Sequence, residues 1–121
     1  MKKLSRKFEE LAGIARTHNA LKTRCNHVAG IYYNERLIAW GRNKKKSHPL
    51  QARFSDRLGR IYLHAEIDAI ATFLRSLSIY ALAETEMVII RLKANELASS
   101  KPCLGCERAL ITFNLKDVRW S

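Results

Sequence analysis

The sequence has 121 residues, of which 47% are hydrophobic, and it carries a formal net charge of +11. This length predicts one globular domain (residues 1–121) with a single core, and the apolar content excludes a wholly disordered chain. No apolar run approaches the roughly 20 residues that a membrane helix needs, and the basic N-terminus lacks the apolar block of a secretory signal. We therefore expect no membrane partner.

The positive charge is unevenly distributed along the chain. Residues 1–26 carry 7 Lys/Arg and 2 Glu, residues 42–63 carry 7 Lys/Arg and one Asp, and residues 64–121 carry 7 of each sign. An excess that lies entirely ahead of residue 64 favours an anionic partner, so nucleic acid is a candidate partner of basic residues 1–63. A solvated surface that only confers solubility is the alternative.

The first half of the chain predicts a helix followed by a hairpin. Residues 3–19 predict an amphipathic helix that covers one face of a sheet. Its apolar stripe consists of Leu4, Phe8, Leu11, Ala12 and Ala15. The segments 27–33 and 36–41 are rich in β-forming residues, and Asn34-Glu35 between them predicts a tight hairpin. Residues 42–63 form a connection long enough to suggest a functional role.

The second half predicts two helices and two short strands. The first helix runs from His64 to about Leu77, with an apolar stripe of Ile67, Ile70, Ala71, Leu74 and Leu77. Residues 86–92 predict a strand that is covered on both faces, and residues 93–101 predict a loop. A second helix is expected from Cys103 to about Phe113, and a last strand over residues 118–120. The predicted sheet therefore has four strands.

Three residues have the chemistry of a zinc site. Cys103 and Cys106 are three positions apart, so both sulfurs can bind one ion, and His64 offers a third ligand. Three protein ligands leave one tetrahedral position for water, which is typical of catalytic zinc. Zinc makes such a water acidic enough to yield hydroxide near neutral pH, and Glu66 is placed to carry the proton. An ordinary carboxylate at a helix N-terminus is the alternative for Glu66.

The cysteine count indicates the compartment. Three cysteines are an odd number, and two of them belong to the metal pattern, so we expect a reducing, cytoplasmic setting. Cys25 is interpreted as a buried or half-buried thiol, with a second metal site beside His27 as the alternative.

Together, His64-Ala65-Glu66 and Pro102-Cys103-Leu104-Gly105-Cys106 match the His-x-Glu … Pro-Cys-x-x-Cys signature of zinc-dependent nucleobase deaminases. From about Val28 onward the chain resembles the cytidine and deoxycytidylate deaminase superfamily. Gly41-Arg42-Asn43 is similar to the end of that family's second strand. The resemblance implies an α/β fold of three α/β/α layers around a mixed central sheet, here short at its C-terminal end.

The resemblance also implies roles for individual residues. The cofactor would be Zn²⁺, held by His64, Cys103 and Cys106, with Glu66 as the catalytic proton carrier. Asn43 would contact the substrate sugar, and the backbone around Ala65 would position the base. The basic connection that follows Asn43 supplies the candidates for phosphate contacts, namely Lys44, Lys45, Lys46 and His48.

The implied activity is hydrolytic deamination of a cytosine nucleotide of the dCMP type. Deamination of cytosine or adenine within single-stranded DNA or RNA is the alternative, and an inactive zinc-stabilised binding module is a lesser one. Gly105, where tRNA adenosine deaminases usually have Met, disfavours adenosine. Because larger relatives continue beyond the last strand, a sheet edge needs covering, and we expect a homo-oligomer.

Overall fold

The computed structural model describes residues 2–17, 25–44, 48–54, 63–93 and 96–121. The elements follow one another as α1 (Lys2–Thr17), β1 (Cys25–Tyr33), β2 (Arg36–Arg42), α2 (Pro49–Phe54), α3 (Ala65–Leu74), the 3₁₀ helix η1 (Ile79–Glu84), β3 (Glu86–Lys93), β4 (Glu96–Ala98), α4 (Leu104–Thr112) and β5 (Asp117–Trp120). None of the helices in these described ranges is long and apolar enough to cross a membrane.

The sheet is mixed, as predicted. Its order is β2-β1-β3-β4 with antiparallel neighbours, and β5 pairs in parallel with the first half of β3. The predicted hairpin is confirmed: β1 and β2 pair from Tyr33↔Arg36 to Val28↔Arg42. Its two turn residues, Asn34 and Glu35, have φ values of 48° and 67°, the backbone of the tight turns that match strand twist.

The prediction of four strands was wrong, because residues 96–98 form a fifth. This strand, β4, pairs with residues 91–93 of β3, whereas β5 pairs with residues 86–89. The two short strands therefore share one edge of β3. A three-residue strand has no alternation that a sequence pattern can detect, and its partner decides whether it forms.

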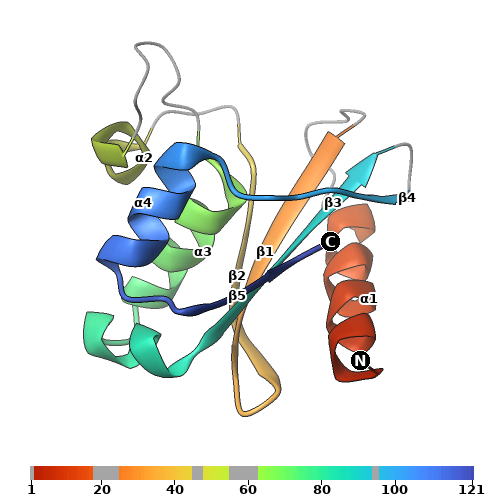
Figure 1. Cartoon of the computed structure of the whole chain (residues 1–121), viewed down its shortest axis with the longest axis horizontal. Helices are drawn as coiled ribbons and strands as arrows, with labels where there is room; N and C mark the ends of the chain where they lie inside the picture. Colours follow the sequence, from red (N-terminus) through yellow and green to blue (C-terminus); the bar gives the residue numbers. More distant parts are fainter. Residues whose placement is uncertain (1, 18–24, 45–47, 55–62, 94–95) are drawn as a thin grey trace.

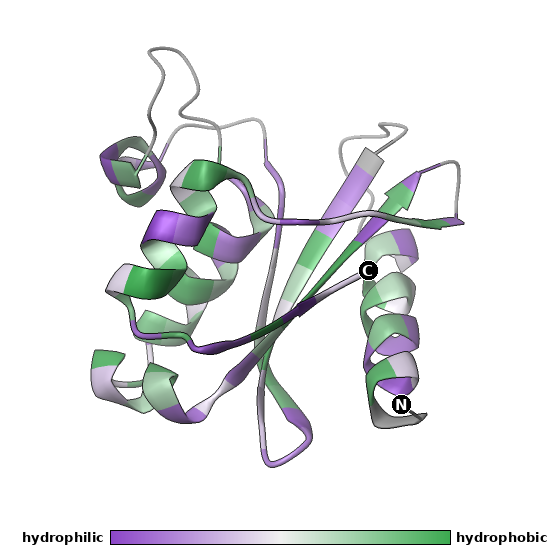
Figure 2. Cartoon of the chain, in the orientation of Figure 1, coloured by the Kyte–Doolittle hydropathy of each residue, from purple (hydrophilic) through white to green (hydrophobic). Residues whose placement is uncertain are grey.

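Helices cover both faces of the sheet and give the predicted three layers. Figure 1 shows α1 on one face and α3 with α4 on the other. Each face has its own apolar cluster: Leu11, Val28 and Ile90 belong to the one under α1, and Ile31, Ile67 and Ile89 to the one under α3. The hydrophobic residues follow α3 and the central strands (Figure 2). Burying these two clusters drives the layered arrangement.

The helix that contains Glu66 is shorter than its predicted range. The helix that contains Glu66 begins at Ala65 and ends at Leu74, so Leu77 lies outside it and is 45% exposed. Phe73 is buried instead. The last apolar residue of a stripe is the least constrained, because the helix end depends on tertiary contacts that the periodicity does not contain.

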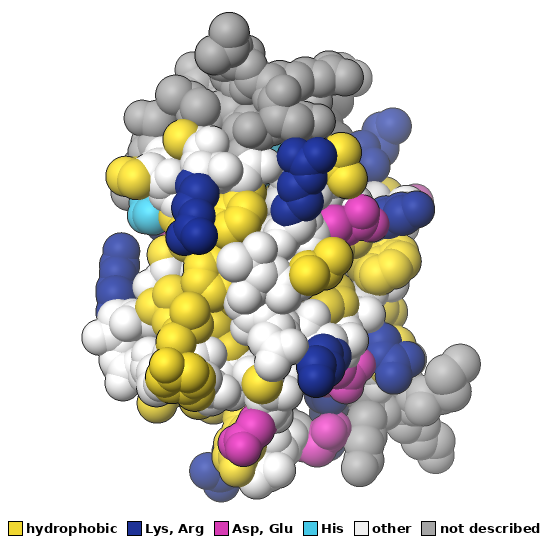
Figure 3. Space-filling view, turned by 60° about the vertical axis from the view of Figure 1, so that its left-hand side comes forward, with side chains coloured by type: hydrophobic (Ala, Val, Ile, Leu, Met, Phe, Trp, Pro, Cys, Tyr) yellow, Lys and Arg dark blue, Asp and Glu magenta, His cyan; other side chains and the backbone are white. Residues whose placement is uncertain are grey.

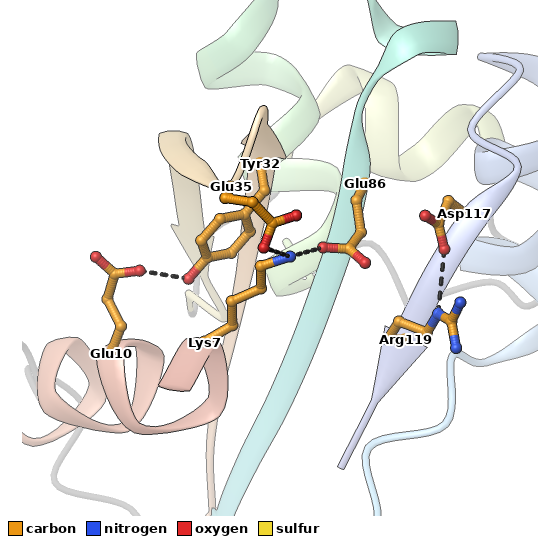
Figure 4. A network of polar contacts seen from close by, with 7 residues as sticks. All are labelled: Lys7, Glu10, Tyr32, Glu35, Glu86, Asp117 and Arg119. Atoms are coloured by element: carbon orange, nitrogen blue, oxygen red, sulfur yellow. Dashed lines mark hydrogen bonds and ion pairs between the residues drawn. The ribbon is translucent and has the colours of Figure 1, made fainter. Parts of the chain in front are cut away.

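A polar network fastens α1 to the sheet (Figure 4). The ammonium of Lys7 is buried and pairs with Glu86 on β3 and with Glu35 in the hairpin turn, whose carboxylate lies 3.1 Å away. The same ammonium lies 5.1 Å from the ring centre of Tyr32, whose hydroxyl donates to Glu10 at 2.7 Å. One buried cation therefore joins the first helix, the hairpin and the central strand.

Candidate active site

The metal-binding candidates meet where two helices begin. His64 is the N-cap of α3 and Cys103 is the N-cap of α4, while Cys106 lies in the first turn of α4. The predicted helices began at His64 and Cys103. In the structure both residues have extended backbones and directly precede the helices. The Cys103 sulfur accepts the backbone N–H of Cys106 at 3.5 Å, so the thiolate also caps the helix.

The distances between the three donors fit a tetrahedral zinc ion. The Nδ1 atom of His64 lies 3.3 Å from the Cys106 sulfur and 3.5 Å from the Cys103 sulfur. All three donor atoms lie within 4.8 Å of one another. Zn–N and Zn–S bonds of about 2.1 and 2.3 Å at tetrahedral angles require N···S separations of roughly 3.6 Å. One nitrogen and two sulfurs are also ligands that zinc prefers, so the residues fit the ion.

The two thiols differ in their electrostatics. Hydrogen bonds from Cys106 and His64 lower the pKa of Cys103 to about 4. The pKa of Cys106 is raised, first by its contact with the Cys103 sulfur and second by burial. Two neighbouring thiolates repel each other, so without a cation one of them keeps its proton. A divalent ion removes that conflict, because a bound thiol is deprotonated.

Glu66 lies beside this cluster with its side chain buried. It is 5% exposed and lines the same cavity as His64 and Cys103. Burial raises its pKa, and a backbone hydrogen bond only partly offsets this. A carboxyl group with a raised pKa accepts and releases a proton more readily near neutral pH than an exposed one does.

The cavity next to the cluster has a volume of about 290 Å³. The residues that line it include His27, Asn43, His64, Ala65 and Glu66. Ser100, Lys101 and Cys103, from the segment before α4, complete the lining. Of the residues predicted for substrate contacts, the structure thus brings Asn43 and Ala65 to the cavity.

Hydrogen bonds define how Asn43 faces this cavity. Its Oδ1 atom accepts the backbone N–H of His27 at 3.0 Å. This bond fixes the orientation of the amide, whose NH₂ group can donate to a ligand. Asp68 holds the neighbours of Asn43 on both sides, because it accepts the Arg42 backbone N–H at 3.0 Å and the Lys44 ammonium at 3.2 Å.

The other phosphate-contact candidates lie elsewhere. Lys44 does not line the cavity and is paired with Asp68. His48 lines a separate, shallow groove with Leu50, Arg53 and Arg75 on the helical side of the molecule, where basic side chains border a band of hydrophobic ones (Figure 3). Lys45 and Lys46 lie outside the described residues. The Cys25 side chain also lies outside them, and His27 faces the cavity rather than a second metal cluster among the described residues.

No motif in the sequence indicates two further residues that shape the site. Gln51, on the short helix α2, is 2% exposed, and its Oε1 atom accepts the backbone N–H of His64 at 3.0 Å. Ser100 is 3% exposed and donates from its hydroxyl to the Ile89 carbonyl at 2.9 Å. Neither belongs to a recognisable spacing pattern, and only the packing of distant segments brings them here.

Comparison with solved structures identifies the architecture. The chain is similar to a dCMP deaminase from the cyanophage S-TIM5, with a TM-score of 0.59 and 16% identity, over 95% of this chain and 82% of that one. It has the cytidine-deaminase-like fold. It is also similar to the cytidine deaminase of Mycobacterium tuberculosis, with a TM-score of 0.51 and 12% identity, over 93% of this chain and 82% of that one. A mutant of the same enzyme has a TM-score of 0.52, also at 12% identity, over 93% of this chain and 83% of that one.

No family model and no curated protein sequence matches this chain. The similarity to known proteins therefore rests on the three-dimensional arrangement. That arrangement is the fold that the sequence motifs predicted. In this fold the metal-binding candidates stand at the start of α3 and α4, on the face of the sheet opposite α1.

Proposed function

We propose that this protein is a zinc-dependent deaminase that hydrolyses a cytosine nucleotide of the dCMP type to the uracil nucleotide and ammonia. The observation that carries the proposal is the buried carboxylate of Glu66 in a cavity shared with a His-Cys-Cys cluster of zinc-compatible geometry. A structural zinc site has no use for such a carboxylate. The similarity to dCMP and cytidine deaminases supports the same reaction class.

His64, Cys103 and Cys106 would hold the zinc ion. When bound, zinc acidifies a water molecule so that a nucleophile forms near neutral pH. The overall reaction would add the oxygen of a water molecule to ring carbon C4 and break the bond to the exocyclic amine, which leaves as ammonia. Glu66 carries one proton of the attacking water to the ring nitrogen, where it stays in the uracil product, and then carries the second proton, from the hydroxyl now on C4, to the leaving amine. Its raised pKa suits both steps.

The remaining lining residues would orient the substrate. Asn43 presents its amide NH₂ group to a sugar hydroxyl, because its oxygen is bound by the His27 N–H. The backbone at Ala65, at the first position of α3, lies beside the base. Such positioning places the reacting carbon against the cluster, and holding two reactants in place lowers the barrier.

One observation favours a second candidate function, deamination within a single-stranded nucleic acid. The excess positive charge lies wholly ahead of α3, in residues 1–63. A polynucleotide that contacts many basic residues would lose affinity steeply as salt rises, whereas a single nucleotide would show a shallow dependence. The homo-oligomer and the cellular location stay predictions.

The test is ammonia release by zinc-loaded protein offered dCMP, deoxycytidine, dCTP and a cytosine-containing single-stranded oligonucleotide. Glu66→Ala serves as the blank, with its zinc content measured to show that the cluster is intact. If the unmodified protein turns over dCMP and Glu66→Ala does not, the proposal is supported. If the unmodified protein turns over only the oligonucleotide, the second candidate is supported. If neither protein releases ammonia from any of the four compounds, both candidate functions are overturned.

A further inference from the structure

A segment far from the basic connection brings a cation to the cavity. Lys101 lines the cavity two residues before Cys103, and it belongs to the half of the chain whose charges balance. The distribution of net charge along the sequence therefore did not indicate Lys101 as a phosphate contact. Among the described residues that line the cavity, Glu66 is the one carboxylate and Lys101 the one ammonium.

A second positive charge lies behind the cavity wall. His27 on β1 and Arg91 on β3 are paired across the sheet, so their side chains share one face. That is the face of Ala29 and Ile89, which pack under α3 and α4. Arg91 also donates to the Ser99 carbonyl at 3.3 Å, which places it under the segment that carries Lys101. Burial and the positive charge of Arg91 both lower the pKa of His27.

The backbone of Lys101 is held on both sides. The Ser100 N–H donates to the Ser121 carbonyl at 3.0 Å, and the Ser100 hydroxyl donates to the Ile89 carbonyl at 2.9 Å. Pro102, on the other side, is buried. Lys101 itself is exposed between these two anchors. A cation whose backbone is fixed in this way loses less conformational freedom on binding an anion than one in an unanchored segment.

The size of the cavity indicates what part of a ligand would meet this lysine. Its volume of about 290 Å³ is just below the roughly 300–1,000 Å³ found for small-molecule pockets. It suits a nucleobase and part of a sugar, so a phosphate attached to that sugar would stay at the rim. Lys101 is the exposed lining residue with a positive charge.

From these observations, and resting on the proposed function, we propose that Lys101 binds the phosphate of the substrate, with Arg91 reinforcing the positive potential beneath it. The chemical group recognised is a phosphate ester next to the sugar, from a free nucleotide or from a strand. The sequence predicted phosphate contacts from Lys44, Lys45, Lys46 and His48. The present proposal assigns the contact to the segment before α4 instead. Lys101 is thus a specificity-determining residue that distinguishes a nucleotide from a nucleoside.

The test measures equilibrium binding by calorimetry, with zinc-loaded Glu66→Ala protein so that no turnover occurs. The ligands are dCMP, deoxycytidine and a short cytosine-containing single-stranded oligonucleotide. Lys101→Gln in this background should weaken dCMP about tenfold, the cost of one charge-assisted hydrogen bond, and leave deoxycytidine unchanged. Lys116→Gln, which removes an exposed lysine between α4 and β5, is the matched control. His48→Gln tests the assignment made from sequence.

Each outcome decides the proposal. An effect of Lys101→Gln on dCMP alone supports it with a free nucleotide as the source, and an effect confined to the oligonucleotide supports it with a strand as the source. Equal weakening of dCMP and deoxycytidine, no effect on either phosphate ligand, or no phosphate ligand bound by the parent protein overturns it. Because binding is measured without turnover, absence of ammonia release by the unmodified chain would reject the proposed function and not this inference.

Discussion

Gly41 at the end of β2 lies directly against the backbone of Ala69 on α3. A Cβ atom built on Gly41 would lie 2.3 Å from the Ala69 nitrogen and 2.7 Å from the Ala65 carbonyl oxygen. Real Cβ atoms do not approach backbone atoms so closely, so only glycine allows this contact between strand and helix. The contact sets the distance between the sheet and the helix that carries Glu66.

We expect Gly41→Ala to push α3 away from β2, because both contacts are with backbone that has no rotamer to change. The free energy of unfolding should fall by roughly 1–3 kcal/mol, the range typical of overpacked core substitutions. Urea unfolding measures the change. Gly13→Ala is the control, since nothing lies within 4 Å of its added carbon; it should stabilise α1 by about 0.5–1 kcal/mol. Equal stability of the two variants would contradict the prediction.

Gln51 is expected to set the affinity for zinc through His64. Gln51→Ala removes the acceptor of the His64 backbone N–H and leaves that ligand less well oriented. Loss of such supporting contacts typically weakens metal binding about 10–100-fold, which a titration against a chromophoric chelator measures. Arg53→Ala, an exposed substitution on the same helix, is the control. Unchanged zinc affinity in Gln51→Ala would show that α2 does not position the ligand.

Asp68 should affect the substrate more than the metal. Asp68→Ala frees the Arg42 N–H and the Lys44 ammonium, which flank Asn43, and should lower the free energy of unfolding by about 1–3 kcal/mol. We expect a raised KM for deamination with zinc content unchanged. Asp117→Ala, which breaks an exposed ion pair with Arg119, should cost less than about 1 kcal/mol. A KM equal to that of the unmodified protein would separate Asp68 from substrate binding.

The network around Lys7 predicts a loss of stability at alkaline pH. Burial alone would lower the pKa of Lys7, but its bonds to Glu86 and Glu35 outweigh this and raise it above 10.5. Burial and the bond to Glu10 raise the pKa of Tyr32 above its ordinary value of 10.0. Both groups therefore hold protons in the folded state that they lose in the unfolded chain as the pH rises through about 10. The folded state loses stability over that range.

Urea unfolding at pH values from 8 to 11 tests this expectation. Tyr32→Phe should be less stable than the unmodified protein at pH 8 by about 1 kcal/mol, because the bond to Glu10 is lost. The difference should shrink above pH 10, since phenylalanine has no proton to lose. Tyr80→Phe, at an 87% exposed position, is the control. A difference that stays constant with pH would contradict the prediction.

The sequence by itself determined which residues are candidates for the site, and it predicted most of the architecture. His64, Glu66, Cys103 and Cys106 are recognisable as candidates because metal ligands and a proton carrier require particular residue types at short, regular spacings. The hairpin and the main helices are recognisable because apolar periodicity reflects which face is buried. These signals are local in the chain, so they survive without coordinates.

Only the tertiary structure decided which other side chains serve that site. Gln51 meets His64, Asp68 engages Lys44, and Lys101 reaches the cavity because segments up to tens of residues apart pack together. Lysine is common on every surface, and its sequence position does not say whether it faces a carboxylate or a cavity. The phosphate contacts were therefore predicted in the basic connection, residues 42–63, only because positive charge is dense there. In the folded protein Lys44 of this connection pairs with Asp68, and the lysine that lines the cavity is Lys101, from the half of the chain whose charges balance.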